Sequence, residues 1–131
     1  MKQIDHVGIA VKNLDDAVNL FQNTYGAELV WRKVFEDQKL ESAFMRIGKS
    51  YFELSMSIDP EGVIAKFIEQ KGEGIHHISI CVDDFKETTR KLEEKGMKIM
   101  GQTSTDEFTV AFVHPKNNLG VLMEIIERKD G

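Results

Sequence analysis

Two residues that can bind metal ions occur twice in this sequence with the same displacement. His6 and Glu53 recur as His77 and Glu124, each 71 residues further along the chain (77 − 6 and 124 − 53). A displacement shared by two polar residues predicts one structural unit that is used twice. A histidine and a carboxylate from each copy would supply two nitrogen and two oxygen ligands, which suit a divalent ion of intermediate hardness. The sequence therefore predicts a metal site formed by these four residues.

The residues around the two histidines repeat as well. Residues 6–17, HVGIAVKNLDDA, match residues 77–88, HISICVDDFKET, in their alternation of apolar and small residues. In a strand, residues two apart share a face, so small residues such as Gly8 and Ser79 lie beside the histidines. Small neighbours leave room for a cavity around the candidate ligands.

Each candidate ligand taken alone has an ordinary structural explanation. A histidine at the start of a strand usually hydrogen-bonds within the fold, and a glutamate on a strand usually faces solvent. Glu53 and Glu124, however, stand in the apolar segments YFELSM and VLMEII. Burying an unpaired carboxylate is costly, and a bound cation removes that cost. The metal site is therefore favoured, whereas His76 should face outward and His114, before Pro115, is expected in a turn.

The elements that would position these residues follow the order β-α-β-β-β in each copy. Strands are expected near residues 3–11, 28–35, 39–47 and 50–57, and again near 75–82, 97–103, 108–114 and 121–127. The first helix should begin at Asn13 and end at Gly26, and the second should begin at Asp83 or Asp84 and end at Gly96. A short amphipathic helix is expected between the copies.

The length of 131 residues is that of one domain. Its expected parts are module one, about 1–58, a linker helix, about 59–74, and module two, about 75–131. Each module alone is too small to bury its sheet. We therefore expect an α+β fold in which two paired βαβββ modules form a curled eight-stranded mixed sheet around a metal-binding cup.

Composition narrows the range of partners and locations. The chain is 41% hydrophobic and 30% charged, as in ordinary globular proteins, and its net charge of −5 argues against nucleic-acid binding. No apolar run is long enough to span a membrane, and the N-terminus lacks the apolar region of a signal peptide. Cys81 is the single cysteine, so no intrachain disulfide is possible and a cytoplasmic location is expected.

The sequence resembles the vicinal oxygen chelate superfamily, which includes glyoxalase I, extradiol dioxygenases and methylmalonyl-CoA epimerase. The resemblance covers almost the whole chain and is closest to the epimerases. Three segments carry it: residues 6–17, residues 64–78 (IAKFIEQKGEGIHHI), and HPK at 114–116 followed by GVLME at 120–124. It implies one divalent ion held by His6, His77 and Glu124, with Glu53 as the fourth ligand. Cobalt, nickel, manganese, zinc and magnesium are all candidates for the ion.

Two segments depart from the epimerase pattern. Epimerases carry a Gly-Ala-His-Gly-like loop before the seventh strand, where this chain has GQTSTDEF at residues 101–108. Some members carry a second catalytic glutamate on the third strand, and the alignment places Ser42 there with Glu41 beside it. The departures leave the predicted metal site intact, and they leave the substrate and the second base open.

The resemblance implies a metal-dependent isomerase of the methylmalonyl-CoA epimerase type. Such an enzyme moves a proton on and off one carbon of an acyl-CoA thioester through a metal-stabilised enolate. Glu124 is expected to be the first base, and Glu41 is the candidate for the second, although alternation with Ser42 can turn it outward. The resemblance also implies a homodimer.

Three other functions compete with the epimerase interpretation. The first is a lactoylglutathione lyase of the glyoxalase I type, acting on a glutathione adduct. The chain lacks the early arginine of those enzymes and has Ala10 and Lys12 in that region. The second is a non-catalytic small-molecule binding protein, which has little need of four ligands. An iron extradiol dioxygenase, with two histidines and one carboxylate, ranks last.

Overall fold

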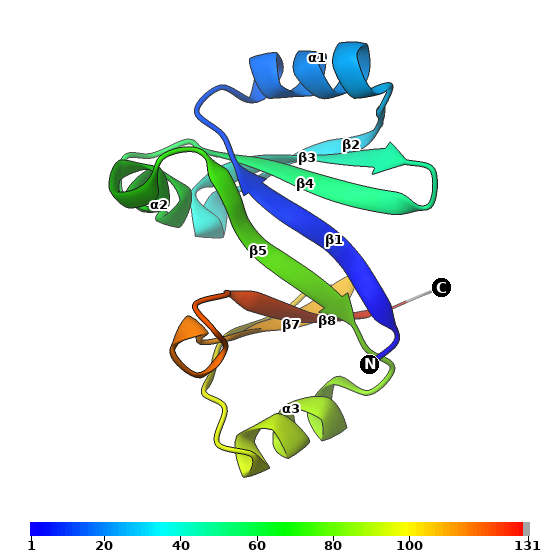
Figure 1. Ribbon diagram of the computed structural model, residues 1–131, viewed down its shortest axis with the longest axis vertical. Coiled ribbons are helices and arrows are strands. Elements are labelled where there is room, and N and C mark those ends of the chain that lie inside the picture. Colours follow the sequence, from blue (N-terminus) through cyan, green and yellow to red (C-terminus); the bar gives the residue numbers. More distant parts are fainter. Residues whose placement is uncertain (130–131) are drawn as a thin grey trace. The chain divides into compact units, whose positions relative to one another are not determined.

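The computed structural model describes residues 1–129, in which eight strands and three helices form an α+β fold (Figure 1). The elements are β1 Gln3–Ala10, α1 Leu14–Tyr25, β2 Glu28–Phe35, β3 Leu40–Ile47, β4 Ser50–Ser57, α2 Val63–Lys71, β5 Gly74–Cys81, α3 Phe85–Glu94, β6 Ile99–Ser104, β7 Phe108–Val113 and β8 Met123–Arg128. The order β-α-β-β-β occurs twice with α2 between the copies, as the sequence predicted. The last two residues of the expected second module lie outside the described residues.

The chain divides into two compact units whose boundaries lie inside strands. The N-terminal unit comprises residues 6–76, and the C-terminal unit comprises residues 1–5 together with the chain from residue 77 onward. Hydrogen bonds attach the first residues to the rest of the C-terminal unit. The Lys2 amide donates to the Cys81 carbonyl at 2.9 Å, and the Arg128 guanidinium donates twice to the Asp5 carboxylate, at 2.9 and 2.7 Å.

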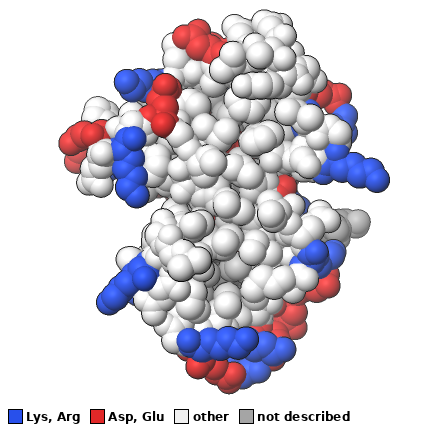
Figure 2. Space-filling view, in the orientation of Figure 1, with Lys and Arg blue, Asp and Glu red and all other residues white. Residues whose placement is uncertain are grey.

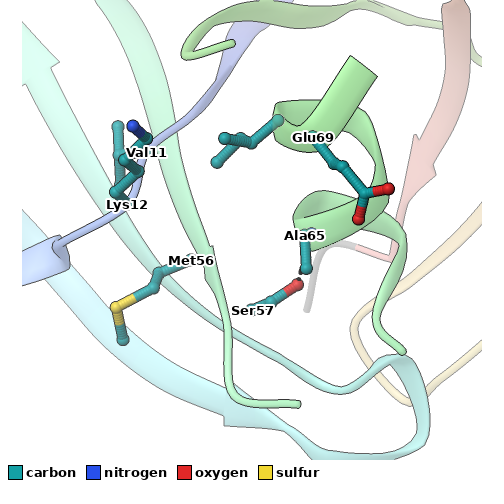
Figure 3. Close-up of a pocket in the computed structure, with 7 residues that line it drawn as sticks. Val11, Lys12, Met56, Ser57, Ala65 and Glu69 are labelled. Atoms are coloured by element: carbon teal, nitrogen blue, oxygen red, sulfur yellow. Dashed lines mark hydrogen bonds between the residues drawn. The ribbon is translucent and has the colours of Figure 1, made fainter. Parts of the chain in front are cut away.

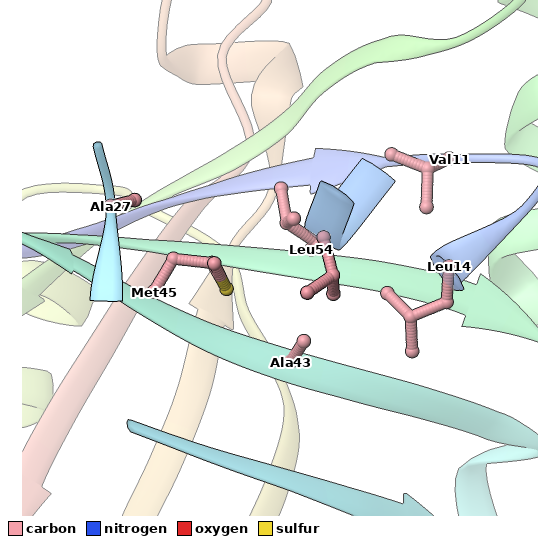
Figure 4. Packing of buried hydrophobic residues seen from close by; sticks show 7 residues of the cluster. Val11, Leu14, Ala27, Ala43, Met45 and Leu54 are labelled. Atoms are coloured by element: carbon pink, nitrogen blue, oxygen red, sulfur yellow. The ribbon is translucent and has the colours of Figure 1, made fainter. Parts of the chain in front are cut away.

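In the N-terminal unit the strand order is β2-β3-β4-β1, with β1 and β4 parallel and the other pairs antiparallel. Helix α1 lies along one face of this sheet (Figure 1). Asn13 caps the helix by accepting from the Asp16 amide at 3.0 Å, and Gly26 ends it at φ +67°. The buried core between helix and sheet consists of Val11, Leu14, Val18, Ala27, Ala43, Met45 and Leu54 (Figure 4).

The C-terminal unit repeats this arrangement with the order β5-β8-β7-β6, and β5 and β8 are parallel. Asp84 is the N-cap of helix α3 and accepts from the Glu87 amide at 3.0 Å, so it is the capping residue of the two aspartates that the sequence offered. The buried core beneath α3 consists of Val82, Phe85, Ala111, Val113 and Ile125.

Two strands of the C-terminal unit begin later than the sequence predicted. Strand β6 was expected from about residue 97, but the Met97 amide donates to the Leu92 carbonyl at 3.1 Å and so closes α3. Strand β8 was expected from about residue 121, but the Val121 amide donates to the Asn118 carbonyl at 3.0 Å. In both places the backbone N–H group donates to a turn, so it is not available for hydrogen bonding between strands.

The outer face of α3 carries charges of both signs (Figure 2). Arg90 pairs with Glu87 and Glu94 on this helix, at the spacings of three and four residues that bring side chains together. Exposed pairs of this kind contribute little to stability, so we interpret this face as solvated surface. Within residues 1–129, no helix combines the length and the apolar character that crossing a bilayer requires.

Candidate metal centre

The His6 and Glu53 side chains meet on the sheet face that lies opposite α1. Strands β1 and β4 are parallel neighbours, and Gly8, two residues after His6, is the register partner of Glu53. The His6 Nε2 atom lies 3.3 Å from the Glu53 Oε1 atom. His6 is 4% exposed, and the Glu53 side chain is 19% exposed. A histidine and a carboxylate are thus brought together away from bulk water.

An aromatic group holds the His6 ring from the side. Phe44 on β3 is the register partner of Glu53, and its ring meets the imidazole edge-on with centroids 5.4 Å apart. Phe44 itself stacks between Trp31 and Tyr51, with centroids 5.0 Å apart in both pairs. This packing restricts the rotation of the imidazole and keeps Nε2 toward Glu53.

The C-terminal unit contains the same three residue types in the same register. His77 on β5 and Glu124 on β8 are buried, at 7% and 8% exposed, and Ser79, two residues after His77, is the register partner of Glu124. Phe112 on β7 is also a register partner of Glu124, and its ring meets His77 edge-on at 5.8 Å. Each unit therefore presents a histidine, a glutamate and a supporting phenylalanine on the face opposite its helix.

Arg128 places a permanent positive charge on the strand that carries Glu124. It lies four residues further along β8, so the two side chains share a face. The hydrogen bonds to Asp5 raise the pKa of Arg128 above its ordinary value, burial opposes this, and the charges of Asp5, Cys81 and Glu124 reinforce it. The guanidinium itself is held by its two hydrogen bonds to the Asp5 carboxylate, at 2.9 and 2.7 Å.

A family model described as the Glyoxalase/Bleomycin resistance protein/Dioxygenase superfamily matches residues 5–113. The chain belongs to this superfamily. The sequence is 30% identical to the ethylmalonyl-CoA/methylmalonyl-CoA epimerase of Cereibacter sphaeroides over 128 residues, which covers 94% of this chain and 96% of that protein. The expected family is therefore confirmed.

The chain is also similar to a solved structure and to a relative from a second enzyme class. A variant of Streptomyces coelicolor methylmalonyl-CoA epimerase in complex with 2-nitronate-propionyl-CoA matches with a TM-score of 0.93, at 29% identity, covering 99% of each chain. The lactoylglutathione lyase of Neisseria meningitidis is 26% identical over 133 residues, covering 96% of this chain and 91% of that protein. The fold expected from the sequence is thus that of solved epimerases.

Glu41 lies on the sheet face away from the candidate ligands. It alternates with Ser42 on β3 and shares the α1 face with Ala43, and its carboxylate accepts from the Arg32 Nε atom at 2.8 Å. Arg32 also pairs with Asp15 at 2.7 Å, and the hydrogen bonds to Glu41 first and Asp15 second raise the pKa of Arg32. This placement argues against Glu41 as a base, and our proposal leaves it out.

Ser42, the neighbour of Glu41 on β3, has its side chain on the sheet face that carries the candidate ligands. Its Oγ atom lies 2.7 Å from the Ser55 Oγ atom on β4, and both residues are buried. Ser42, which the alignment placed at the position of a second catalytic glutamate, therefore carries a hydroxyl that is paired with that of Ser55. Neither hydroxyl is a strong base at neutral pH, so they contribute shape and polarity to this face.

The two other histidines make structural contacts. The ring of His76 meets Phe67 of α2 edge-on with centroids 5.0 Å apart. His114 precedes a 3₁₀ turn at Pro115–Asn117, and its Nδ1 atom accepts from the Lys116 amide at 2.9 Å. The expectation that His114 is a turn residue is confirmed.

A separate pocket of about 360 Å³ opens between β4 and α2 in the N-terminal unit (Figure 3). Its lining consists of Val11, Lys12, Met56, Ser57, Ala65, Ile68 and Glu69. None of the candidate ligands is among these residues. The Ser57 hydroxyl accepts from the Ala65 amide at 2.7 Å, which fixes the start of α2 against β4. We interpret the pocket as a consequence of how α2 packs.

Proposed function

We propose that the protein is a divalent-metal-dependent epimerase of the methylmalonyl-CoA type, in which His6, Glu53, His77 and Glu124 hold one ion. The observation that carries the proposal is the repeated histidine, glutamate and phenylalanine arrangement in the two units. Similarity to epimerases over 94% of the chain supports the reaction class.

The geometry of the His6 and Glu53 pair fits a metal ion. Two ligand atoms that each lie about 2.1 Å from one ion are roughly 3.0–3.4 Å apart in octahedral or tetrahedral coordination. The His6 Nε2 and Glu53 Oε1 atoms are 3.3 Å apart. His77 likewise offers a ring nitrogen, so nitrogen and oxygen donors are both available. This donor set accepts several divalent ions, including cobalt, nickel, manganese, zinc and magnesium.

The protein side chains would carry the proton transfers. Glu124 is buried on the strand that carries Arg128, and we assign it removal of the α-proton of a bound acyl-CoA thioester. Epimerisation then requires proton return to the opposite side of that carbon. Glu53 carries the other candidate carboxylate, and its side chain, 19% exposed, is the more accessible to solvent, so we assign it the second transfer. It would take a proton from water and pass it to the carbon, while Glu124 returns its proton to water. When bound, a divalent ion would supply the positive charge that stabilises the substrate oxygens as the proton leaves.

The proposal is tested by following exchange of the α-proton of methylmalonyl-CoA in D₂O by ¹H NMR. Metal-loaded wild type should catalyse the exchange, and removal of metal by EDTA should stop it until metal is restored. His114→Ala is the matched control, because that histidine makes a structural contact in a turn. Exchange that continues undiminished after metal removal would contradict the proposal.

A lactoylglutathione lyase is the alternative, favoured by the similarity to the lyase of Neisseria meningitidis. The same metal-loaded protein should be assayed with the hemithioacetal of methylglyoxal and glutathione. Turnover of that adduct without α-proton exchange on methylmalonyl-CoA would replace the epimerase by the lyase. Inactivity on both substrates, with metal bound, would favour a binding protein.

A further inference from the structure

The hydroxyl of Ser79 is buried without a hydrogen-bond partner in the part of the chain that the structure describes. Ser79 is 0% exposed, and its Oγ atom contacts no donor or acceptor among residues 1–129. The other buried serines of the sheets behave differently. Ser42 and Ser55 are also buried, but their hydroxyls lie 2.7 Å apart and satisfy one another. Ser79 therefore has no evident role in holding the fold together.

The N-terminal unit folds in the same pattern without a hydroxyl at the equivalent position. The repeat displacement relates Ser79 to Gly8 (79 − 8 = 71), and both residues are register partners of a candidate glutamate ligand. Glycine fills the position in one unit, so the local backbone tolerates the loss of the side chain. A buried hydroxyl that has given up its hydrogen bonds to water lowers the free energy of unfolding. The hydroxyl thus costs stability unless a bound group accepts its hydrogen bond.

Ser79 stands between the two candidate ligands of its unit. It follows His77 by two residues on β5, and it is the register partner of Glu124 on the neighbouring strand β8. Alternation along β5 therefore puts its side chain on the face that carries His77 and Glu124. An oxygen atom bound beside Glu124 would lie within reach of the Ser79 hydroxyl.

We infer that the Ser79 hydroxyl is a positioning group that donates a hydrogen bond to an oxygen atom bound beside Glu124. That oxygen belongs to water when no substrate is present, or to the carbonyl or carboxylate of the substrate. The inference rests on the proposed metal site, and it does not depend on which reaction the site performs. It also explains why the hydroxyl has no partner among residues 1–129, since its partner arrives with the ligand.

Ser79→Ala separates this role from a structural one, with Ser55→Ala as the matched control. Without metal, Ser79→Ala should melt at or above the wild-type temperature, because it removes a hydroxyl that has no protein partner. Ser55→Ala should melt lower, because it leaves the buried Ser42 hydroxyl without its partner. Differential scanning fluorimetry of the metal-free proteins measures both shifts.

Binding supplies the second readout. Calorimetric titration with Co²⁺ should show that Ser79→Ala binds about 2- to 12-fold more weakly if the oxygen belongs to water. If it belongs to the substrate, Co²⁺ affinity should hold and the KM should rise by a similar factor, measured with whichever substrate the wild type turns over, methylmalonyl-CoA or the hemithioacetal. A metal-free Ser79→Ala protein that melts well below wild type, or one that changes neither affinity nor KM, would overturn the inference. Wild type that binds no Co²⁺ would overturn the metal site itself, and the inference with it.

Discussion

The Nε2 atom of His6 lies 3.3 Å from the Oε1 atom of Glu53, on two parallel neighbouring strands. The register that brings them together pairs the residue two positions after the histidine with the glutamate. Strands β5 and β8 have the same register, because Ser79 pairs with Glu124. The repeated displacement in the sequence thus corresponds to a repeated register in the structure. This correspondence is why we assign the two histidine–glutamate pairs to one function.

Replacing Glu124 by glutamine should remove the first base and leave the fold intact. Glutamine has nearly the same size, but its amide does not accept a proton, so turnover should fall by about 10²- to 10⁴-fold. The α-proton exchange assay measures the loss, and circular dichroism checks the fold. A folded Glu124→Gln protein with wild-type exchange rates would exclude this residue as the base.

Replacing Glu41 by glutamine should leave the exchange rate within about two-fold of wild type. The Glu41 carboxylate pairs with Arg32 on the α1 side of the sheet, so it does not face the candidate ligands. The partly exposed ion pair should contribute no more than about 1 kcal/mol to the free energy of unfolding. Urea denaturation measures that loss. A drop in exchange comparable to that of Glu124→Gln would restore Glu41 as a second base.

Phe44→Leu should weaken metal binding, because it removes the ring that supports His6. Phe21→Leu is the control, since Phe21 meets Phe52 edge-on at 5.4 Å and packs against the core cluster on the α1 side. Both variants should lose about 1–2 kcal/mol of stability. Only Phe44→Leu should lower Co²⁺ affinity in a calorimetric titration. Equal Co²⁺ affinities in the two variants would show that the Phe44 ring does not affect metal binding.

The thiol of Cys81 should titrate above the ordinary range of a cysteine. Burial is the main cause that raises the pKa of Cys81, and the negative charge of Asp5 raises it further. A raised thiol pKa means that the fold prefers the neutral form. Its stabilising contribution is therefore complete below the pKa of the unfolded state and is lost as pH rises through the folded value.

Alkylation by iodoacetamide between pH 7 and 10 measures the Cys81 pKa. The rate should rise at a higher pH in the folded protein than in the same protein unfolded in guanidinium chloride. A folded midpoint at or below the unfolded one would contradict this assignment of the environment of Cys81.

Local features of the fold could be predicted because they depend on nearby residues. Asn13 as N-cap, Gly26 at the helix end and the turn between β3 and β4 follow from side-chain and backbone preferences within a few positions. The ligand candidates could be predicted because β1 and β4 repeat in β5 and β8 without a change in spacing. Because His6 and Glu53 recur at the same displacement, the repeated register is visible in the sequence.

Contacts that depend on loop length or on distant residues were not predicted. Phe44 and Phe112 have equivalent roles, but they are 68 residues apart (112 − 44), because the β7–β8 connection is longer than the β3–β4 turn. The pair of Asp5 and Arg128 joins residues that are 123 positions apart, and no local pattern relates them. The face on which Glu41 lies was left open, and the register of β3 with β4 determines it.

We propose that the two histidine–glutamate pairs hold one ion together, and Co²⁺ stoichiometry tests this most directly. Calorimetric titration of metal-free protein should give one Co²⁺ per chain for wild type and for the control His114→Ala. His6→Ala and His77→Ala should each lose that same binding event, with affinity lower by more than about 100-fold. Two ions per chain in wild type, or full binding after loss of either histidine, would contradict a single shared site.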